Sequence, residues 1–174
     1  MGEDETTVEI VEKDENNFIT HVDNIVSNRV YTTQTSENII FLHDKYRFKG
    51  IGIDDNGVGF GVFSEILRDK TTKRVAVSLN NESRELDDEG EKSKRILKEE
   101  MYFRLLAWME KGRIFMLSDE GVKESLKSIQ FKLELKQGQP TRHVIYGNYS
   151  HIAEGIIRAV WLATEDETLN LWVR

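Results

Sequence analysis

At 174 residues, with 39% apolar and 32% charged residues, the chain has the size and composition of one domain with a full hydrophobic core. The absence of cysteine excludes a disulfide scaffold and a thiolate zinc site, and no apolar run approaches the roughly 20 residues that cross a bilayer, so we expect a cytosolic protein without a membrane partner. The net charge of -7 argues against a protein that coats DNA by neutralising phosphates, but it is compatible with a DNA enzyme whose carboxylates gather around divalent ions.

The N-terminal segment has the pattern of a strand hairpin followed by a helix. Residues 6–12 and 17–26 alternate apolar and polar side chains on either side of a polar turn, which predicts an antiparallel hairpin. Apolar residues at helical spacing follow Ser36 as far as Tyr46, so we expect a helix with Ser36 as its N-cap.

The next segment predicts a strand, a helix and another strand. The run KGIGID indicates a short buried strand that ends at Asp54. A glycine-rich turn opens into a helix within 57–69, and 73–79 returns to strand. The charge-rich stretch 80–95 has the composition of a loop.

The second half of the chain predicts two helices, a hairpin and a last helix, with a short strand between the first two. The second helix is expected to start from Ser118 as its N-cap, and Gly112 is expected to stop the first. The expected elements span 94–111, 113–117, 119–129, 131–147 and 150–163. Strands and helices in this mixed order indicate an α/β domain with a central mixed sheet.

Asp54 is the first residue that could carry chemistry. An acid at the carboxyl end of a buried strand lies where open α/β folds bind ligands, and the glycines after it allow a sharp turn. These glycines are not followed by the Lys and Ser or Thr of a nucleotide-binding phosphate loop.

His151 and Glu154 form the second candidate. They are three residues apart at the start of the last predicted helix, so both lie on one face and can share a divalent ion. An ordinary pair of surface residues is the alternative interpretation of this spacing.

Three motifs follow one another along the chain: I-D-x-x-G-V-G-x-G-V around Asp54, the segment from Arg95 to Ile114 with its W-x-x-x-G-R-I ending, and S-H-x-x-E at His151. Their order resembles the nuclease domain of viral, phage-type terminase large subunits. The resemblance implies a ribonuclease H-like mixed sheet flanked by helices, with an auxiliary β-hairpin. It also implies a metal-dependent endonuclease that cleaves concatemeric viral DNA during genome packaging, with 1–174 as a single nuclease domain.

The resemblance implies a two-metal site for Mg²⁺ or Mn²⁺, ions that prefer oxygen ligands such as carboxylates. Asp54, Glu154 and His151 are the implied catalytic residues and metal ligands, with Asp4 as a further ligand and Asp55 as an alternate. His151 and Glu154 replace two acids of the family pattern. The family's first strand and its acid have no counterpart, nor has the ATPase motor domain, so we expect a fragment that cuts poorly in Mg²⁺. Removal of the Asp54 side chain is expected to cost little stability.

The implied partners are double-stranded DNA, the portal and the small terminase subunit, in a packaging complex in the host cytoplasm. Basic residues of the second hairpin and of the segment beside the charged loop are the expected phosphate contacts: Lys132, Lys136, Arg142, His143, Lys94, Arg95 and Lys98. Two alternatives stay open, namely a ribonuclease H-like resolvase or nuclease outside packaging, and a catalytically inactive docking domain.

Overall fold

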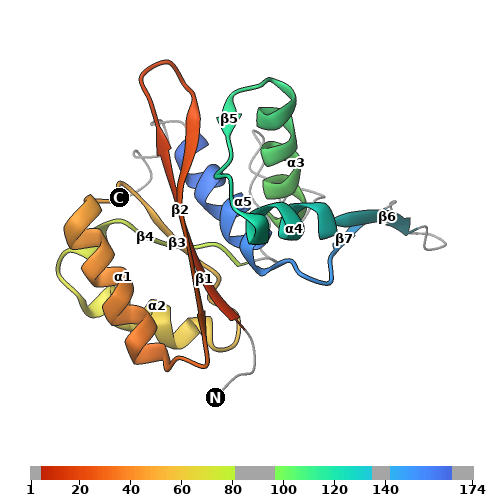
Figure 1. Cartoon of the computed structure of the whole chain (residues 1–174). Helices are drawn as coiled ribbons and strands as arrows, with labels where there is room; N and C mark the ends of the chain where they lie inside the picture. The colour runs from red at the N-terminus through yellow and green to blue at the C-terminus, as the bar shows by residue number, and fades with distance from the viewer. Residues whose placement is uncertain (1–4, 81–96, 135–141, 166–174) are drawn as a thin grey trace, which may run out of the picture.

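The computed structural model describes residues 5–80, 97–134 and 142–165. Its elements are, in chain order, β1 (Glu5–Lys13), β2 (Ile19–Asn28), α1 (Thr32–Tyr46), β3 (Ile51–Ile53), α2 (Gly59–Arg68), the 3-10 helix η1 (Thr72–Arg74), β4 (Ala76–Ser78), α3 (Leu97–Glu110), β5 (Ile114–Phe115), α4 (Glu120–Ser128), β6 (Gln130–Glu134), β7 (Arg142–Tyr146) and α5 (His151–Thr164). The strand predicted for 73–79 is therefore shorter than expected, because its first residues belong to η1. The long β1–β2 hairpin stands between α1 and α2 on one side and α3, α4 and α5 on the other (Figure 1). This arrangement confirms the predicted α/β class.

The strands form a mixed sheet, a parallel pair and a hairpin. Antiparallel β1 and β2 are joined by β5, which is parallel to β2, in the order β1-β2-β5. β3 and β4 pair in parallel, and β6 and β7 form the predicted auxiliary hairpin. In the described part of the chain, β1 and β3 are therefore terminal strands of two separate sheets. The expected central sheet is present in two parts.

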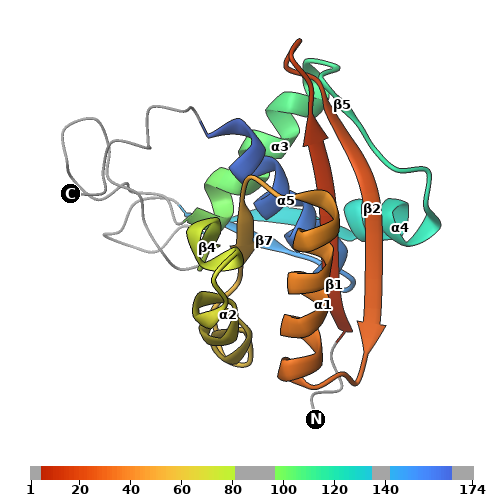
Figure 2. The ribbon, with the colours of Figure 1, turned by 90° about the vertical axis from the view of Figure 1, so that its left-hand side faces the viewer.

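Helix α5 lies at the centre of the molecule, with contacts to β1, β2, β3, α3 and α4 (Figure 2). Its residues are apolar on nearly all sides, the pattern of a buried helix. Side chains that expose 2% of their surface or less are Ile152, Ala153, Ile156, Ile157, Val160 and Trp161. They belong to the larger apolar core, to which α3 and α4 also contribute, whereas α1, α2 and β3 enclose a smaller one.

Two predicted helix caps are wrong. Helix α1 begins at Thr32, and the Ser36 hydroxyl donates to the carbonyl of Thr32 inside the helix, at 2.8 Å. The Tyr31 amide donates to the Gln34 side chain at the start of the helix, so α1 begins four residues before Ser36. Asp119, not Ser118, caps α4, because its carboxylate accepts from the Val122 amide at 3.0 Å and its charge complements the positive helix end. The predicted stop at Gly112 is confirmed by its positive φ of 61°.

The start of α5 is fixed by a side chain from another helix. Ser150, the N-cap residue of α5, makes no capping hydrogen bond with its side chain. Instead the buried Ser125 hydroxyl of α4 accepts from the Ala153 amide at 3.0 Å and donates to the Tyr149 carbonyl at 2.7 Å. The Ser125 hydroxyl thus forms hydrogen bonds with a backbone carbonyl just before α5 and with a backbone amide in its first turn.

Replacing Ser125 with Ala should lower the free energy of unfolding by about 1–3 kcal/mol, because the buried Ala153 amide loses its acceptor. Urea denaturation followed by tryptophan fluorescence measures the change. Ser64→Ala is the matched control, since that exposed hydroxyl only bonds a carbonyl within α2. Equal stability of the two variants would contradict a capping role for Ser125.

Candidate active site

The backbone around Asp54 requires the glycines that follow it. Asp54 comes directly after β3, and the chain then turns so closely into α2 that a Cβ atom on Gly59 would lie 1.8 Å from the Asp54 carbonyl oxygen. Gly57 has a φ of 57°, in the left-handed region that favours glycine. The glycine motif therefore serves the turn that presents Asp54.

Both carboxylate oxygens of Asp54 have partners. Oδ1 accepts from the Asn56 amide at 3.2 Å, and Oδ2 forms an ion pair with Arg158 of α5. Asn56 also exchanges two side-chain hydrogen bonds with Asn80, at 3.2 and 2.7 Å, which joins the segments that follow β3 and β4. The acid is thus held at the common end of the parallel pair.

Glu154 lies on α5 near the same arginine. Its Oε2 is 3.7 Å from Nη1 of Arg158, and its Oε1 is 2.8 Å from Nζ of Lys98 on α3. Asp54 and Glu154 therefore meet at one guanidinium group, although 104 residues separate Asp54 from Arg158. Asp54 therefore contacts α5 through Arg158, one turn after Glu154.

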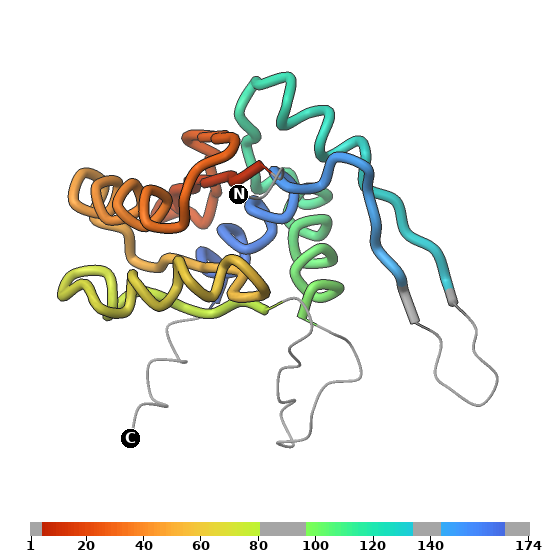
Figure 3. The backbone as a smooth tube through the Cα atoms, turned by 90° about the horizontal axis from the view of Figure 1, so that it is seen from below, coloured from red at the N-terminus to blue at the C-terminus, as the bar shows by residue number. Residues whose placement is uncertain are grey.

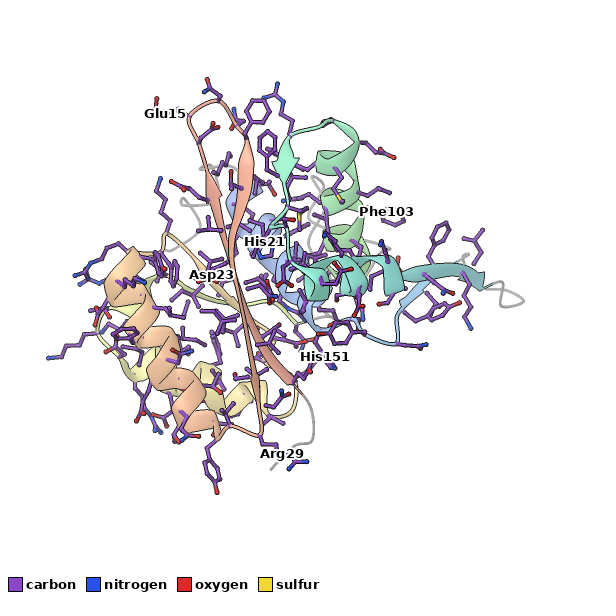
Figure 4. The ribbon with its side chains drawn as sticks, viewed as in Figure 1. Glu15, His21, Asp23, Arg29, Phe103 and His151 are labelled. Atoms are coloured by element: carbon purple, nitrogen blue, oxygen red, sulfur yellow. The ribbon has the colours of Figure 1, made fainter. Side chains whose placement is uncertain are left out.

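His151 lies at the exposed start of α5 (Figure 4). Its backbone carbonyl accepts from the Thr7 hydroxyl at 3.2 Å, whereas its ring, among the described residues, makes no hydrogen bond or ion pair with either acid. Asp4 lies outside the described residues. The Asp55 side chain has a buried Oδ1 atom without a hydrogen-bond partner in the described structure.

The described residues do not fit a two-metal site by themselves. Among them, no three His, Asp or Glu side chains converge in a way that could hold a metal ion. Two carboxylates meet two cationic side chains instead, so the local charge of this group is about zero, whereas hard divalent ions need several oxygen ligands.

Two residues next to the acids, Arg158 and Tyr102, were not predicted from the sequence. Arg158 is 5% exposed, and only its spacing of four residues from Glu154 on one helix face could have indicated a contact. Burial raises the pKa of the Tyr102 hydroxyl well above its usual value, the charge of Glu154 adding to this effect. Tyr102 stays neutral at physiological pH.

A second buried acid lies beneath the first turns of α5. Glu9 of β1 is joined by a hydrogen bond of 2.9 Å to His21 of β2, which is labelled in Figure 4, and both side chains are fully buried. Burial raises the pKa of Glu9, while the hydrogen bond from His21 opposes this shift. A Cβ atom on Gly155 would lie 2.5 Å from Cγ of Glu9, so the small residue allows α5 to approach β1.

The predicted DNA contacts lie on the β6–β7 hairpin, on α3, or outside the described residues. Lys132 is exposed on β6, in a hairpin that projects away from the body of the molecule (Figure 3). Arg142 and His143 are positions of β7 in the same hairpin, and Lys98 is paired with Glu154. Lys94, Arg95 and Lys136 lie outside the described residues. No helix in the described ranges is long and apolar enough to cross a membrane.

Comparison with known proteins gives matches among solved structures alone. No family model and no curated protein matches the chain. The large terminase nuclease of the thermophilic phage G20c with bound cobalt matches with a TM-score of 0.63 and 14% identity, over 91% of this chain and 81% of that one. The magnesium-bound form gives 0.60 and 15%, over 91% and 82%, and a further crystal structure gives 0.62 and 15%, over 94% and 84%.

These matches cover nearly the whole chain and define its fold as that of a phage nuclease. The fold is the one of the large terminase nuclease, as the sequence motifs predicted. With identities of 14 to 15%, the likeness concerns the fold, and the chemistry must be argued from the residues of this chain.

The ion pair with Arg158 changes the expected effect of removing the Asp54 carboxylate. Asp54→Ala should lower the free energy of unfolding by about 1–2 kcal/mol, because it leaves the buried guanidinium with fewer acceptors. Chemical denaturation measures this loss. Asp44→Ala, which breaks an exposed pair with Arg47, is the matched control and should change stability by less than about 1 kcal/mol. A variant as stable as the parent would contradict a structural contribution from the pair.

Proposed function

We propose that this chain is the nuclease domain of a viral DNA-packaging terminase large subunit, a single domain over 1–174. Its activity is divalent-metal-dependent hydrolysis of phosphodiester bonds in concatemeric double-stranded DNA. Its partners are DNA, the portal and the small terminase subunit, within a packaging complex in the host cytoplasm.

One observation carries the proposal. Asp54 and Glu154 come together at the end of β3 and on α5, in a chain that has the fold of a nuclease crystallised with cobalt and with magnesium. Carboxylates at that place are the residues that a metal-dependent nuclease needs. His151 and Asp4 are the further proposed ligands, and Mg²⁺ or Mn²⁺ is the proposed metal.

A second candidate function is a catalytically inactive docking domain. Lys98 and Arg158 neutralise the two acids, which favours a fold retained for contacts within a packaging motor. Metal-dependent cutting of DNA separates the two candidates.

Plasmid nicking by the purified chain, in Mg²⁺, Mn²⁺ and Co²⁺, tests the activity. We expect little cutting in Mg²⁺ and more in Mn²⁺, which tolerates an imidazole ligand and imperfect geometry better. In the metal that supports cutting, Asp54→Asn and Glu154→Gln should each lower the rate at least about tenfold, as losses of metal-site residues do. Asp44→Asn, a change of an exposed acid on α1, is the control. No cutting with any of the metals would favour the docking domain.

The proposed DNA surface is the β6–β7 hairpin together with the basic residues near 94–98. Replacing Lys132, Lys136 and Arg142 with Ala should weaken DNA binding and flatten its dependence on salt, because fewer phosphates are neutralised. Fluorescence anisotropy with a labelled duplex at several salt concentrations measures both effects. Replacing Lys45, Lys70 and Lys73 removes the same charge elsewhere and serves as the control. Unchanged binding by the hairpin variant would assign those residues to solubility.

A further inference from the structure

Arg158 occupies the point at which the two candidate acids converge. One Nη atom pairs with Oδ2 of Asp54, and the other lies 3.7 Å from Oε2 of Glu154. Nε donates to the Leu79 carbonyl at 3.3 Å, and Nη1 donates to the Glu154 carbonyl at 2.7 Å. Every nitrogen of the guanidinium group is therefore engaged, which fixes its position.

The burial of this side chain explains why it needs the acids. Arg158 exposes 7% of its side chain, against 34% for Asp54 and 20% for Glu154. A buried guanidinium without anionic partners is costly, so the fold favours a conformation in which the arginine holds both acids. A divalent ion at the same oxygens would lie a few ångströms from this positive charge and from Lys98, which repel it.

We propose that Arg158 is an internal counter-ion that keeps divalent cations from the Asp54–Glu154 pair, and that metal binds there only when the Arg158 side chain withdraws. The proposal deepens the proposed nuclease function, on which it rests, because it adds a control of metal binding at the same site. The apparent metal affinity is then reduced by the small fraction of molecules in which the arginine has withdrawn.

Titration of Mn²⁺ against the purified chain, followed by the electron paramagnetic resonance signal of free Mn²⁺, tests this without any DNA. Arg158→Gln should bind Mn²⁺ at least about tenfold more tightly than the parent chain, because it removes one adjacent positive charge. Arg68→Gln removes an arginine paired with Glu65 on the exposed face of α2, and it should leave the affinity unchanged.

Two further variants locate the new metal. Adding Asp54→Asn to Arg158→Gln should cancel the gain, because a ligand is lost. Mn²⁺ should also raise the melting temperature of Arg158→Gln more than that of the parent, since a ligand stabilises the state that binds it. Equal affinity of Arg158→Gln and the parent would overturn the proposal, and so would a gain that survives the loss of Asp54.

A second substitution of the same residue keeps the test decisive if Arg158→Gln fails to fold. Arg158→Met replaces the guanidinium with an apolar side chain that suits the buried surroundings of α5, and it should gain Mn²⁺ affinity as Arg158→Gln does. No gain of Mn²⁺ affinity in a folded Arg158→Met variant would overturn the proposal. A gain of Mn²⁺ binding in Arg158→Gln with no DNA cutting at all would instead refute the nuclease function and retain the counter-ion.

Discussion

Helix α5 is surrounded by protein on nearly every side, and one of its buried side chains is the charged Arg158. A buried guanidinium group is stable only where anionic or polar groups accept its hydrogen bonds. Arg158 lies one turn after Glu154 on this helix, among residues that are fully buried. The end of β3 supplies Asp54, and the segment after β4 supplies the Leu79 carbonyl. The parallel pair and the central helix are thus joined at one guanidinium group, and the candidate site lies where this requirement is met.

Patterns within single elements were sufficient to predict most of the fold. Alternation identified both hairpins, helical spacing identified the helices, and the run before Asp54 identified a strand only three residues long. The caps at Ser36 and Ser118 failed for a local reason, since hydroxyl residues fit several positions near a helix start. Gln34 and Asp119 satisfied the amides of the two helix starts instead.

The contacts that define the site join residues that are far apart in the sequence. Lys98 was assigned to DNA because it belongs to a basic segment, but it lies 2.8 Å from a carboxylate 56 residues further along the chain. Arg158 was given no role, because the sequence does not show that α5 is buried on nearly every side. Pairings between residues so far apart depend on how the elements pack, and residue types and spacing along one sequence do not carry that information. The acids could be predicted, whereas their cations could not.

The nuclease fold leads us to expect metal binding at Asp54 and Glu154, whereas the nearby charges of Arg158 and Lys98 oppose it. The proposed role of Arg158 as a counter-ion reconciles the two expectations. On that proposal, an incoming phosphodiester gives Arg158 a second anion, so the guanidinium that leaves Asp54 does not stay unpaired. Its departure exposes both carboxylates to a divalent ion. Linkage requires the effect to be reciprocal, so DNA and metal each favour the binding of the other. On the same proposal, the site is nearly neutral in most molecules while DNA is absent, and bound DNA increases the fraction of molecules whose charge attracts metal.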